Sequence, residues 1–124
     1  MTIRHLALVS LPVADQDRSI AFFRDKLGFE VRRDAQMGSG GSRWVEIAPP
    51  GAQTSITLVT WFEKMPPGCV QGLVLNTPDI GTIRARLERL GVPASEVKSA
   101  PWGRYCTLND PDANGLVIVQ EPEA

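Results

Sequence analysis

The 124-residue sequence predicts an α+β fold built from two copies of one strand–helix–strand–strand–strand unit. Two amphipathic helical segments, each placed between an aspartate and a glycine, alternate with short runs rich in β-branched residues. Matching landmarks recur at a constant offset: Asp15 and Asp79 are 64 residues apart, Leu27 and Leu90 are 63 apart, and Gly51 and Gly115 are 64 apart. A unit this small cannot close a hydrophobic core alone, so we expect the copies to pack together or to exchange with a partner chain.

The first module, residues 1–62, is expected to open with a strand at 3–11. Pro12 stops this strand because proline lacks the N–H that pairing requires. Asp15 can cap the helix that follows, and Gly28 can end it. The apolar stripe of this helix repeats at helical spacing, through Ile20, Phe23 and Leu27. Further strands are predicted at 29–33, 42–48 and 54–62, with a glycine-rich loop at 37–41 and a turn at 49–51.

The second module, residues 69–124, follows the linker EKMPPG (63–68) and repeats this order. A strand at 69–75 precedes a helix that Asp79 can cap and Gly91 can close. Its apolar stripe consists of Ile80, Ile83, Leu87 and Leu90. A weak strand is expected near Val97, and clearer strands at 104–109 and 116–120. We therefore expect a single domain over residues 1–124, made of the two modules.

Composition and charge narrow the function classes. A net charge of −1 provides no electrostatic footprint for nucleic acid or an anionic membrane. No apolar run approaches the ~18 residues of a membrane span. Cys69 and Cys106 lack a C-x-x-C spacing and are typical of buried thiols in a reducing compartment. The sequence therefore predicts a cytoplasmic protein that binds neither nucleic acid nor membrane.

Three segments carry a resemblance to a known family: VADQDRSIAFFRDKLGFEV (13–31), RWVEIAPPG (43–51) and DPDANG (110–115). They resemble the vicinal oxygen chelate superfamily, which includes glyoxalase I, extradiol dioxygenases and bleomycin-resistance proteins. The resemblance implies two βαβββ modules whose mixed sheet curves into a cup, with the helices outside. It indicates the fold more than the function, because such members share a scaffold and differ at the site.

The resemblance also indicates where a metal would be bound. Metal-dependent members place four ligands, drawn from His, Glu and Gln, on the cup face of the first and fourth strand of each module. The matching positions in this chain are Leu8, Thr57, Gly72 and Val117. None of them is a normal ligand for a divalent cation, so we expect no metal and no cofactor. Gln71 could substitute if the register shifts, and His5 is the only histidine, but we interpret both as strand-end or edge residues.

Alternation along each strand separates a face under the helices from a face toward the cup. The large aliphatic side chains belong under the helices, so the remaining set faces the cup. The ligand-binding candidates on or beside the cup face are Trp44, Glu46, Thr57, Trp102, Tyr105 and Thr107. Their aromatic rings suit a planar or apolar ligand, whereas core packing is the competing explanation. Glu46 is a weak candidate for a catalytic base, and an ion pair with Arg43 or Arg104 is the alternative.

These observations favour a metal-independent protein that binds a small aromatic or apolar molecule and resembles the bleomycin-resistance proteins. A homodimer is expected, because association would cover exposed sheet edges. The alternative is an enzyme, a glyoxalase-like lyase or isomerase or a dioxygenase, whose metal site is displaced or absent and in which Glu46 would act as base. A third hypothesis is a structural or regulatory module whose own side chains fill the cup.

Overall fold

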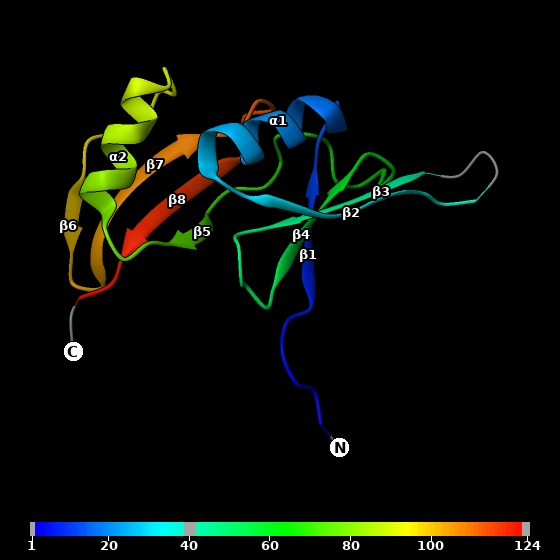
Figure 1. Ribbon diagram of the computed structural model, residues 1–124, viewed down its shortest axis with the longest axis horizontal. Coiled ribbons are helices and arrows are strands. Elements are labelled where there is room, and N and C mark those ends of the chain that lie inside the picture. The colour runs from blue at the N-terminus through cyan, green and yellow to red at the C-terminus, as the bar shows by residue number, and fades with distance from the viewer. Residues whose placement is uncertain (1, 39–41, 123–124) are drawn as a thin grey trace. The chain divides into compact units, whose positions relative to one another are not determined.

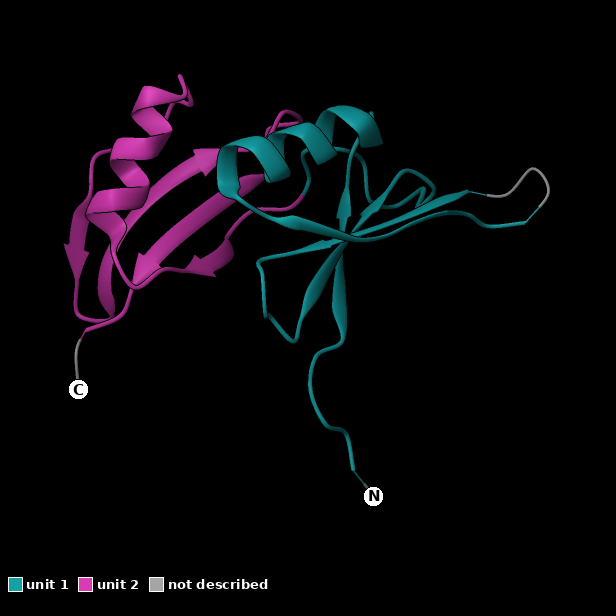
Figure 2. Cartoon of the chain, in the orientation of Figure 1, with its two compact units in different colours: residues 1–69 teal, residues 70–124 magenta. Residues whose placement is uncertain are grey.

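The computed structural model describes residues 2–38 and 42–122, and the chain forms two compact units, Met1–Cys69 and Val70–Ala124 (Figure 2). Unit 1 contains β1 (Leu8–Pro12), α1 (Gln16–Leu27), β2 (Glu30–Gln36), β3 (Arg43–Ala48) and β4 (Ser55–Val59). Unit 2 contains β5 (Leu73–Asn76), α2 (Ile80–Arg89), β6 (Lys98–Ala100), β7 (Gly103–Asn109) and β8 (Gly115–Gln120). The predicted α+β fold of two βαβββ modules is therefore confirmed. The cup that both sheets would share stays a prediction.

Each unit contains a four-stranded mixed sheet in which the first strand lies beside the last (Figure 1). The strand order is β1-β4-β3-β2 in unit 1 and β5-β8-β7-β6 in unit 2. The pairs β1–β4 and β5–β8 are parallel, and the remaining pairs are antiparallel. A parallel pair needs a long crossover connection, which the helix and the following strands supply in both units.

The helices begin at the aspartates that the sequence indicates. The Asp15 side chain accepts the backbone N–H of Arg18 at 3.1 Å, and Gly28 ends α1 with a left-handed φ of 76°. The Asp79 side chain accepts both the hydroxyl of Thr82, at 2.7 Å, and its backbone N–H, at 3.2 Å. These hydrogen bonds lower the pKa of Asp79 below its ordinary value, and the bond from the Thr82 hydroxyl has the larger effect. Neither described helix has the length and apolar composition that a membrane crossing requires.

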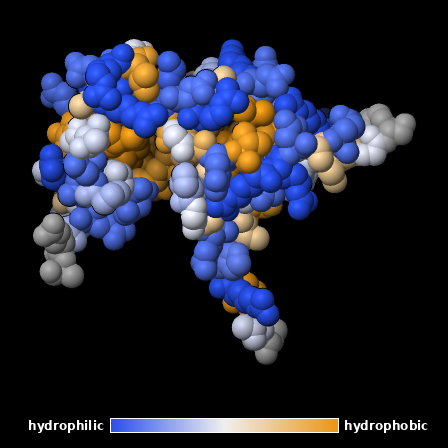
Figure 3. Space-filling view, viewed as in Figure 1, coloured by the Kyte–Doolittle hydropathy of each residue, from blue (hydrophilic) through white to orange (hydrophobic). Residues whose placement is uncertain are grey.

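Each helix packs on one face of the sheet in its own unit. In each unit the core lies between that helix and that sheet. The fully buried side chains include Phe23, Val45, Ile47 and Leu58 in unit 1, and Ile80, Leu87, Cys106 and Leu116 in unit 2. Burial stabilises the fold by about 1.5–3 kcal/mol for each large aliphatic or aromatic side chain. The outer surface of α1 is hydrophilic (blue in Figure 3). The Gln16 amide also anchors α1, because its Nε2 donates to the carbonyls of Arg43 and Leu58, each at 2.8 Å.

The predicted first strand starts too early in the chain. β1 begins at Leu8 because β4, the strand it pairs with, begins at Ser55 directly opposite. Residues 2–7 run past the end of that neighbour and have no regular secondary structure. Ile3 and Leu6 are 85% and 64% exposed there, and the projecting segment shows apolar surface in Figure 3. The sequence of this segment is typical of a strand, but no described strand pairs with it.

Other boundaries also differ from the prediction. β2 extends to Gln36, beyond the predicted end at residue 33, because it pairs with β3. β4 ends at Val59, before the predicted end at residue 62. Gly72 has a left-handed φ of 78°, so β5 cannot begin before Leu73. The weak strand expected near Val97 is β6, at Lys98–Ala100. Residues 39–41 of the predicted loop at 37–41 lie outside the described residues.

The two cysteines have different environments. Both thiols are free. Cys106 is buried on β7, and this burial raises the pKa of its thiol. Cys69 is exposed, so the prediction of a buried thiol is wrong for this residue. It lies in the irregular segment before β5, which no strand pairing draws into the core.

Candidate functional site

The sheet of unit 1 has one face toward α1 and one face away from it. Arg43 bonds to Asp17 of α1 at 2.8 Å, so Arg43 and the residues that alternate with it on β3 face the helix. Trp44 and Glu46 therefore lie on the opposite face. The register of β3 and β4 places Thr57 directly opposite Glu46 on that face. Three of the six ligand-binding candidates thus lie together on one sheet face.

Glu46 is held by two neutral donors. Trp44 donates its indole N–H to Oε1 at 3.2 Å, and Ser55 donates its hydroxyl to Oε2 at 2.8 Å. The carboxylate is partly buried. No Lys, Arg or His nitrogen within the described residues makes an ion pair with it. The arrangement fixes the direction of the carboxylate without neutralising it.

The ion pair anticipated between Glu46 and Arg43 does not form. Arg43 instead bonds to Asp34 through Nε and Nη2, each at 2.8 Å, and to Asp17 through Nη1. The hydrogen bonds that Arg43 donates to Asp34, and next the one to Asp17, raise the pKa of Arg43, and the same guanidinium lowers the pKa of Asp34. These contacts lie on the helix side of the sheet, and Glu46 faces the other side because it is three positions, an odd number, along the strand from Arg43.

Three aromatic rings of unit 1 form a row beside Glu46. The Trp44 and Trp61 ring centroids are 6.2 Å apart at an interplanar angle of 28°. The Trp61 and Phe62 centroids are 5.9 Å apart. We call Trp44, Trp61 and Phe62 the aromatic row. Trp61 was not among the predicted site residues, although the strand predicted at 54–62 includes it; in the structure it lies beyond the end of β4 at Val59.

Thr57 differs from Trp44 and Glu46 because it is fully buried. Its exposed fraction is 0%, and its hydroxyl oxygen has no hydrogen-bond partner among the described residues. Leaving a buried hydroxyl unpaired costs about 1–3 kcal/mol. Its register neighbours are Glu46 on β3 and Ser10 on β1. Thr57 is therefore an unpaired polar group next to a fixed carboxylate.

The remaining candidates lie on unit 2. Trp102 and Tyr105 pack against each other, with ring centroids 4.8 Å apart. Tyr105 and Thr107 lie on β7 opposite Val119 and Val117 of β8, on the face away from α2. Trp102 is 53% exposed, so its indole is not a core residue of this unit.

A pocket of about 710 Å³ opens on unit 2. Its lining includes Gly72, Ser95, Thr107, Asn109, Asp110 and Val117. Thr107 is therefore the one ligand-binding candidate that lines it. Trp102 and Tyr105 are not in the lining, although Tyr105 lies two residues before Thr107 on β7. The pocket mixes hydroxyl, amide and aliphatic groups.

The turn DPDANG shapes one wall of this pocket. Asp110 accepts the backbone N–H groups of Asp112, at 2.9 Å, and Asn114, at 2.8 Å, and it also accepts the side-chain amide of Asn114. Asn114 in turn accepts the backbone N–H of Val70 at 3.1 Å. Gly115 approaches the Gln71 side chain so closely that a Cβ would meet its Oε1. The motif thus positions the segment before β5.

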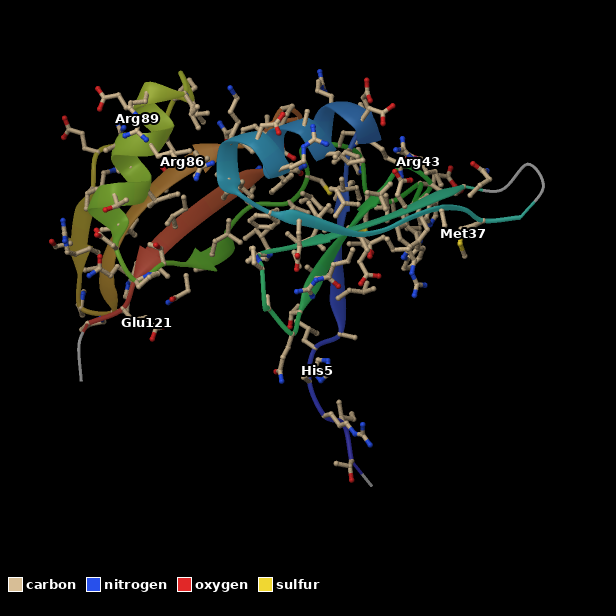
Figure 4. The ribbon with its side chains drawn as sticks, viewed as in Figure 1. His5, Met37, Arg43, Arg86, Arg89 and Glu121 are labelled. Carbon is tan, nitrogen blue, oxygen red and sulfur yellow. The ribbon has the colours of Figure 1, made fainter. Side chains whose placement is uncertain are left out.

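The side chains at the four positions where the resemblance places metal ligands do not fit a divalent cation. Leu8, Gly72 and Val117 offer no donor atom, and Thr57 offers one buried hydroxyl. The Gln71 amide donates to the carbonyl of Ala113 at 3.2 Å. His5 lies on the projecting N-terminal segment, away from the strands of unit 1 (Figure 4). No group of three or more His, Cys, Asp or Glu residues within 2–38 and 42–122 could hold a metal ion.

Comparisons with known proteins agree on one family. The model of the Glyoxalase/Bleomycin resistance protein/Dioxygenase superfamily matches residues 2–118. The chain is 31% identical over 120 residues to YetH, an uncharacterised protein of Bacillus subtilis (strain 168), covering 94% of this chain and 98% of that one.

Two solved structures from Streptomyces sp. CB03234 are also similar. TnmS3, described as an antibiotic binding protein, is 43% identical with a TM-score of 0.92, covering 98% of this chain and 99% of its own. A glyoxalase/bleomycin resistance protein is also 43% identical, with a TM-score of 0.84, covering 94% of this chain and 100% of its own. The similarity extends over nearly the whole length of each protein.

Proposed function

Because this chain belongs to the Glyoxalase/Bleomycin resistance protein/Dioxygenase superfamily, we propose that it binds a small aromatic or apolar molecule without a metal ion. The observation that carries the proposal is the unit 2 pocket of about 710 Å³. Gly72 and Val117 stand where metal-dependent relatives have ligands, and both line this pocket. A glycine and a valine provide space and apolar surface there. Pockets of this size that combine apolar walls with a few polar groups are typical small-molecule sites.

The similarity to TnmS3 supports an antibiotic or an antibiotic-like metabolite as the ligand class. The two chains are 43% identical over almost their full length. Thr107 would orient a polar group of the ligand through its hydroxyl. We further propose that the protein works in the cytoplasm as a homodimer. Val74, on the edge strand β5, is 57% exposed, which supports association through this face.

The second candidate function is an enzyme of the same superfamily, a lyase, isomerase or dioxygenase. One observation favours it: the Glu46 carboxylate is fixed by Trp44 and Ser55 and has no cationic partner among the described residues. A general base needs a fixed direction of this kind. This candidate is favoured over binding alone if the protein converts a bound compound to product. In that case Glu46→Gln should abolish product formation and retain binding.

The test of the first candidate is a binding screen with planar antibiotics and aromatic metabolites, read by calorimetry. Val117→Phe should fill part of the pocket and weaken binding of any hit by about tenfold or more, the equivalent of about 1.4 kcal/mol. Val31→Phe is the matched control, because Val31 is an exposed valine on β2 of unit 1 and does not line the pocket. Equal affinity in wild type and Val117→Phe, with both folded, would contradict the proposal.

Metal independence has its own measurement. Protein purified without an affinity tag and dialysed exhaustively should contain far less than one equivalent of zinc, iron, nickel or manganese. Binding of a hit should also be the same with and without a chelator. A stoichiometric metal, or binding abolished by the chelator, would reject this part of the proposal.

A further inference from the structure

Glu46 is the starting point, because its surroundings differ from those of the ion-paired carboxylates in unit 1. Asp17 and Asp34 are bonded to Arg43, and Glu30 is bonded to Arg32. Glu46 is partly buried, yet no described Lys, Arg or His forms an ion pair with it. Two neutral donors, the Trp44 indole and the Ser55 hydroxyl, hold it instead. Such a group retains its attraction for a cation.

The carboxylate also has capacity for another donor. An ionised carboxylate offers about four acceptor positions, and Trp44 and Ser55 occupy two of them. A primary ammonium group carries three N–H donors and can bond to more than one acceptor. The local chemistry therefore matches a protonated amine better than a neutral alcohol.

The aromatic row supplies the second half of the recognition. Trp44, which donates to Glu46, stacks on Trp61, and Trp61 contacts Phe62. Indole faces attract cations and stack on planar rings. The competing cation is Arg33, which lies opposite Glu46 across β2 and β3. Arg33 is exposed and makes no ion pair with Glu46, so it does not neutralise the carboxylate.

We infer that Glu46 and the aromatic row form a binding site in unit 1 for an aromatic primary amine in its protonated form. The ammonium group bonds to the Glu46 carboxylate, and the ring packs on the Trp44–Trp61–Phe62 row. This inference goes beyond the proposed function, because none of these residues lines the unit 2 pocket. Glu46 determines specificity for the charge, and the rings determine specificity for shape.

The test compares three probes that share one ring system: 2-naphthylmethylamine, 2-naphthylmethanol and the trimethylammonium analogue of the amine. Calorimetry at neutral pH and low salt gives the affinities. The amine should bind about tenfold or more tightly than the alcohol, because hydrogen bonds to charged groups are stronger than neutral ones. The trimethylammonium analogue has no N–H donor, so it should bind more weakly than the amine. The amine should also shift the NMR resonance of the Trp44 indole N–H, assigned with Trp44→Phe.

Glu46→Gln keeps the shape and removes the charge, so the amine-to-alcohol affinity ratio should fall to about 1 while the alcohol affinity stays nearly constant. Asp25→Asn is the control, because it makes the same change of charge on α1. Equal binding of amine and alcohol by wild type, an unchanged ratio in Glu46→Gln, or no shift of the Trp44 indole would overturn the inference. These outcomes leave the proposed function intact, since that is tested by Val117→Phe.

Discussion

The side chain of Asn114 accepts the backbone N–H of Val70 at 3.1 Å, and this bond joins the turn before β8 to the segment before β5. Asn114 is fully buried, and its amide nitrogen donates to Asp110 at 2.8 Å. The DPDANG motif is therefore a structural connection. It holds the approach to the parallel strand pair β5–β8, and Asp110 itself lines the unit 2 pocket.

Asn114→Ala should destabilise the protein, because it leaves the Val70 N–H and one Asp110 oxygen without this partner. The expected loss is about 1–3 kcal/mol in the free energy of unfolding, measured with urea. Asn109→Ala is the control, because Asn109 is exposed and should change stability by less than about 0.5 kcal/mol. A loss no larger than that of the control would show that the connection contributes little.

Two glycines of unit 2 should respond differently to alanine. Gly103 has a φ of 137°, and a Cβ there would meet the backbone carbonyl of Gln120 and the Cα of Glu121. Since neither backbone group can move independently, Gly103→Ala should cost about 2 kcal/mol or more. At Gly115 the Cβ would meet only the end of the Gln71 side chain, which can rotate away.

Gly115→Ala should therefore cost less than about 1 kcal/mol, mainly through the exposed Gln71 bond to Ala113. Thermal and urea unfolding of both variants provide the comparison. If Gly115→Ala were the more damaging of the two, the close approach of Gln71 would be more rigid than the contacts indicate.

The repeat, the helix caps and the sheet faces could be predicted from the sequence because they depend on local rules. Asp15 and Asp79 cap helices through hydrogen bonds to residues only three positions later in the chain, and strand alternation depends on backbone geometry alone. The start of β1 could not be predicted in this way. Leu8 is the first strand residue because of where β4 begins, 47 residues later in the chain, at Ser55.

The candidate site follows the same division. Alternation places Trp44 and Glu46 on one face, as their sequence positions indicate. The Ser55 bond to Glu46 depends on the register between two strands, which no local pattern reveals. Trp61 joins the aromatic row from beyond the end of β4, and the complete burial of Thr57 depends on tertiary packing. These features required the three-dimensional structure.

Stability should depend on pH through Asp34. Its bond to Arg43 lowers the pKa of Asp34 in the folded protein. A carboxyl group with a depressed folded pKa stabilises the protein above its unfolded pKa, near 3.9, and this contribution is lost as the pH falls through the folded value. The stability difference between wild type and Asp34→Asn should thus be largest above about pH 5 and shrink toward about pH 2.

The size of this effect is limited by solvent, because the Asp34 side chain is 41% exposed. We expect less than about 1 kcal/mol at neutral pH, and less again in high salt. Urea unfolding over this pH range is the measurement. In an Arg43→Gln background the Asp34→Asn substitution should lose most of its pH dependence. A difference that instead grew on acidification would reverse the assigned sign.

The Trp102→Ala variant tests whether this indole contacts a ligand or only packs in the core. The Trp102 indole is 53% exposed and contacts Tyr105, so Trp102→Ala should cost less than about 1.5 kcal/mol of stability. Tyr105 lies two residues from Thr107, which lines the unit 2 pocket, so a ligand longer than the pocket would reach this ring pair. Stacking contributes about 0.5–1.5 kcal/mol per ring pair, so Trp102→Ala should weaken such a ligand about two- to tenfold. Trp61→Ala, which removes an indole from unit 1, should leave the same ligand unaffected. Unchanged affinity in a folded Trp102→Ala variant would mean that this indole is no part of the ligand site.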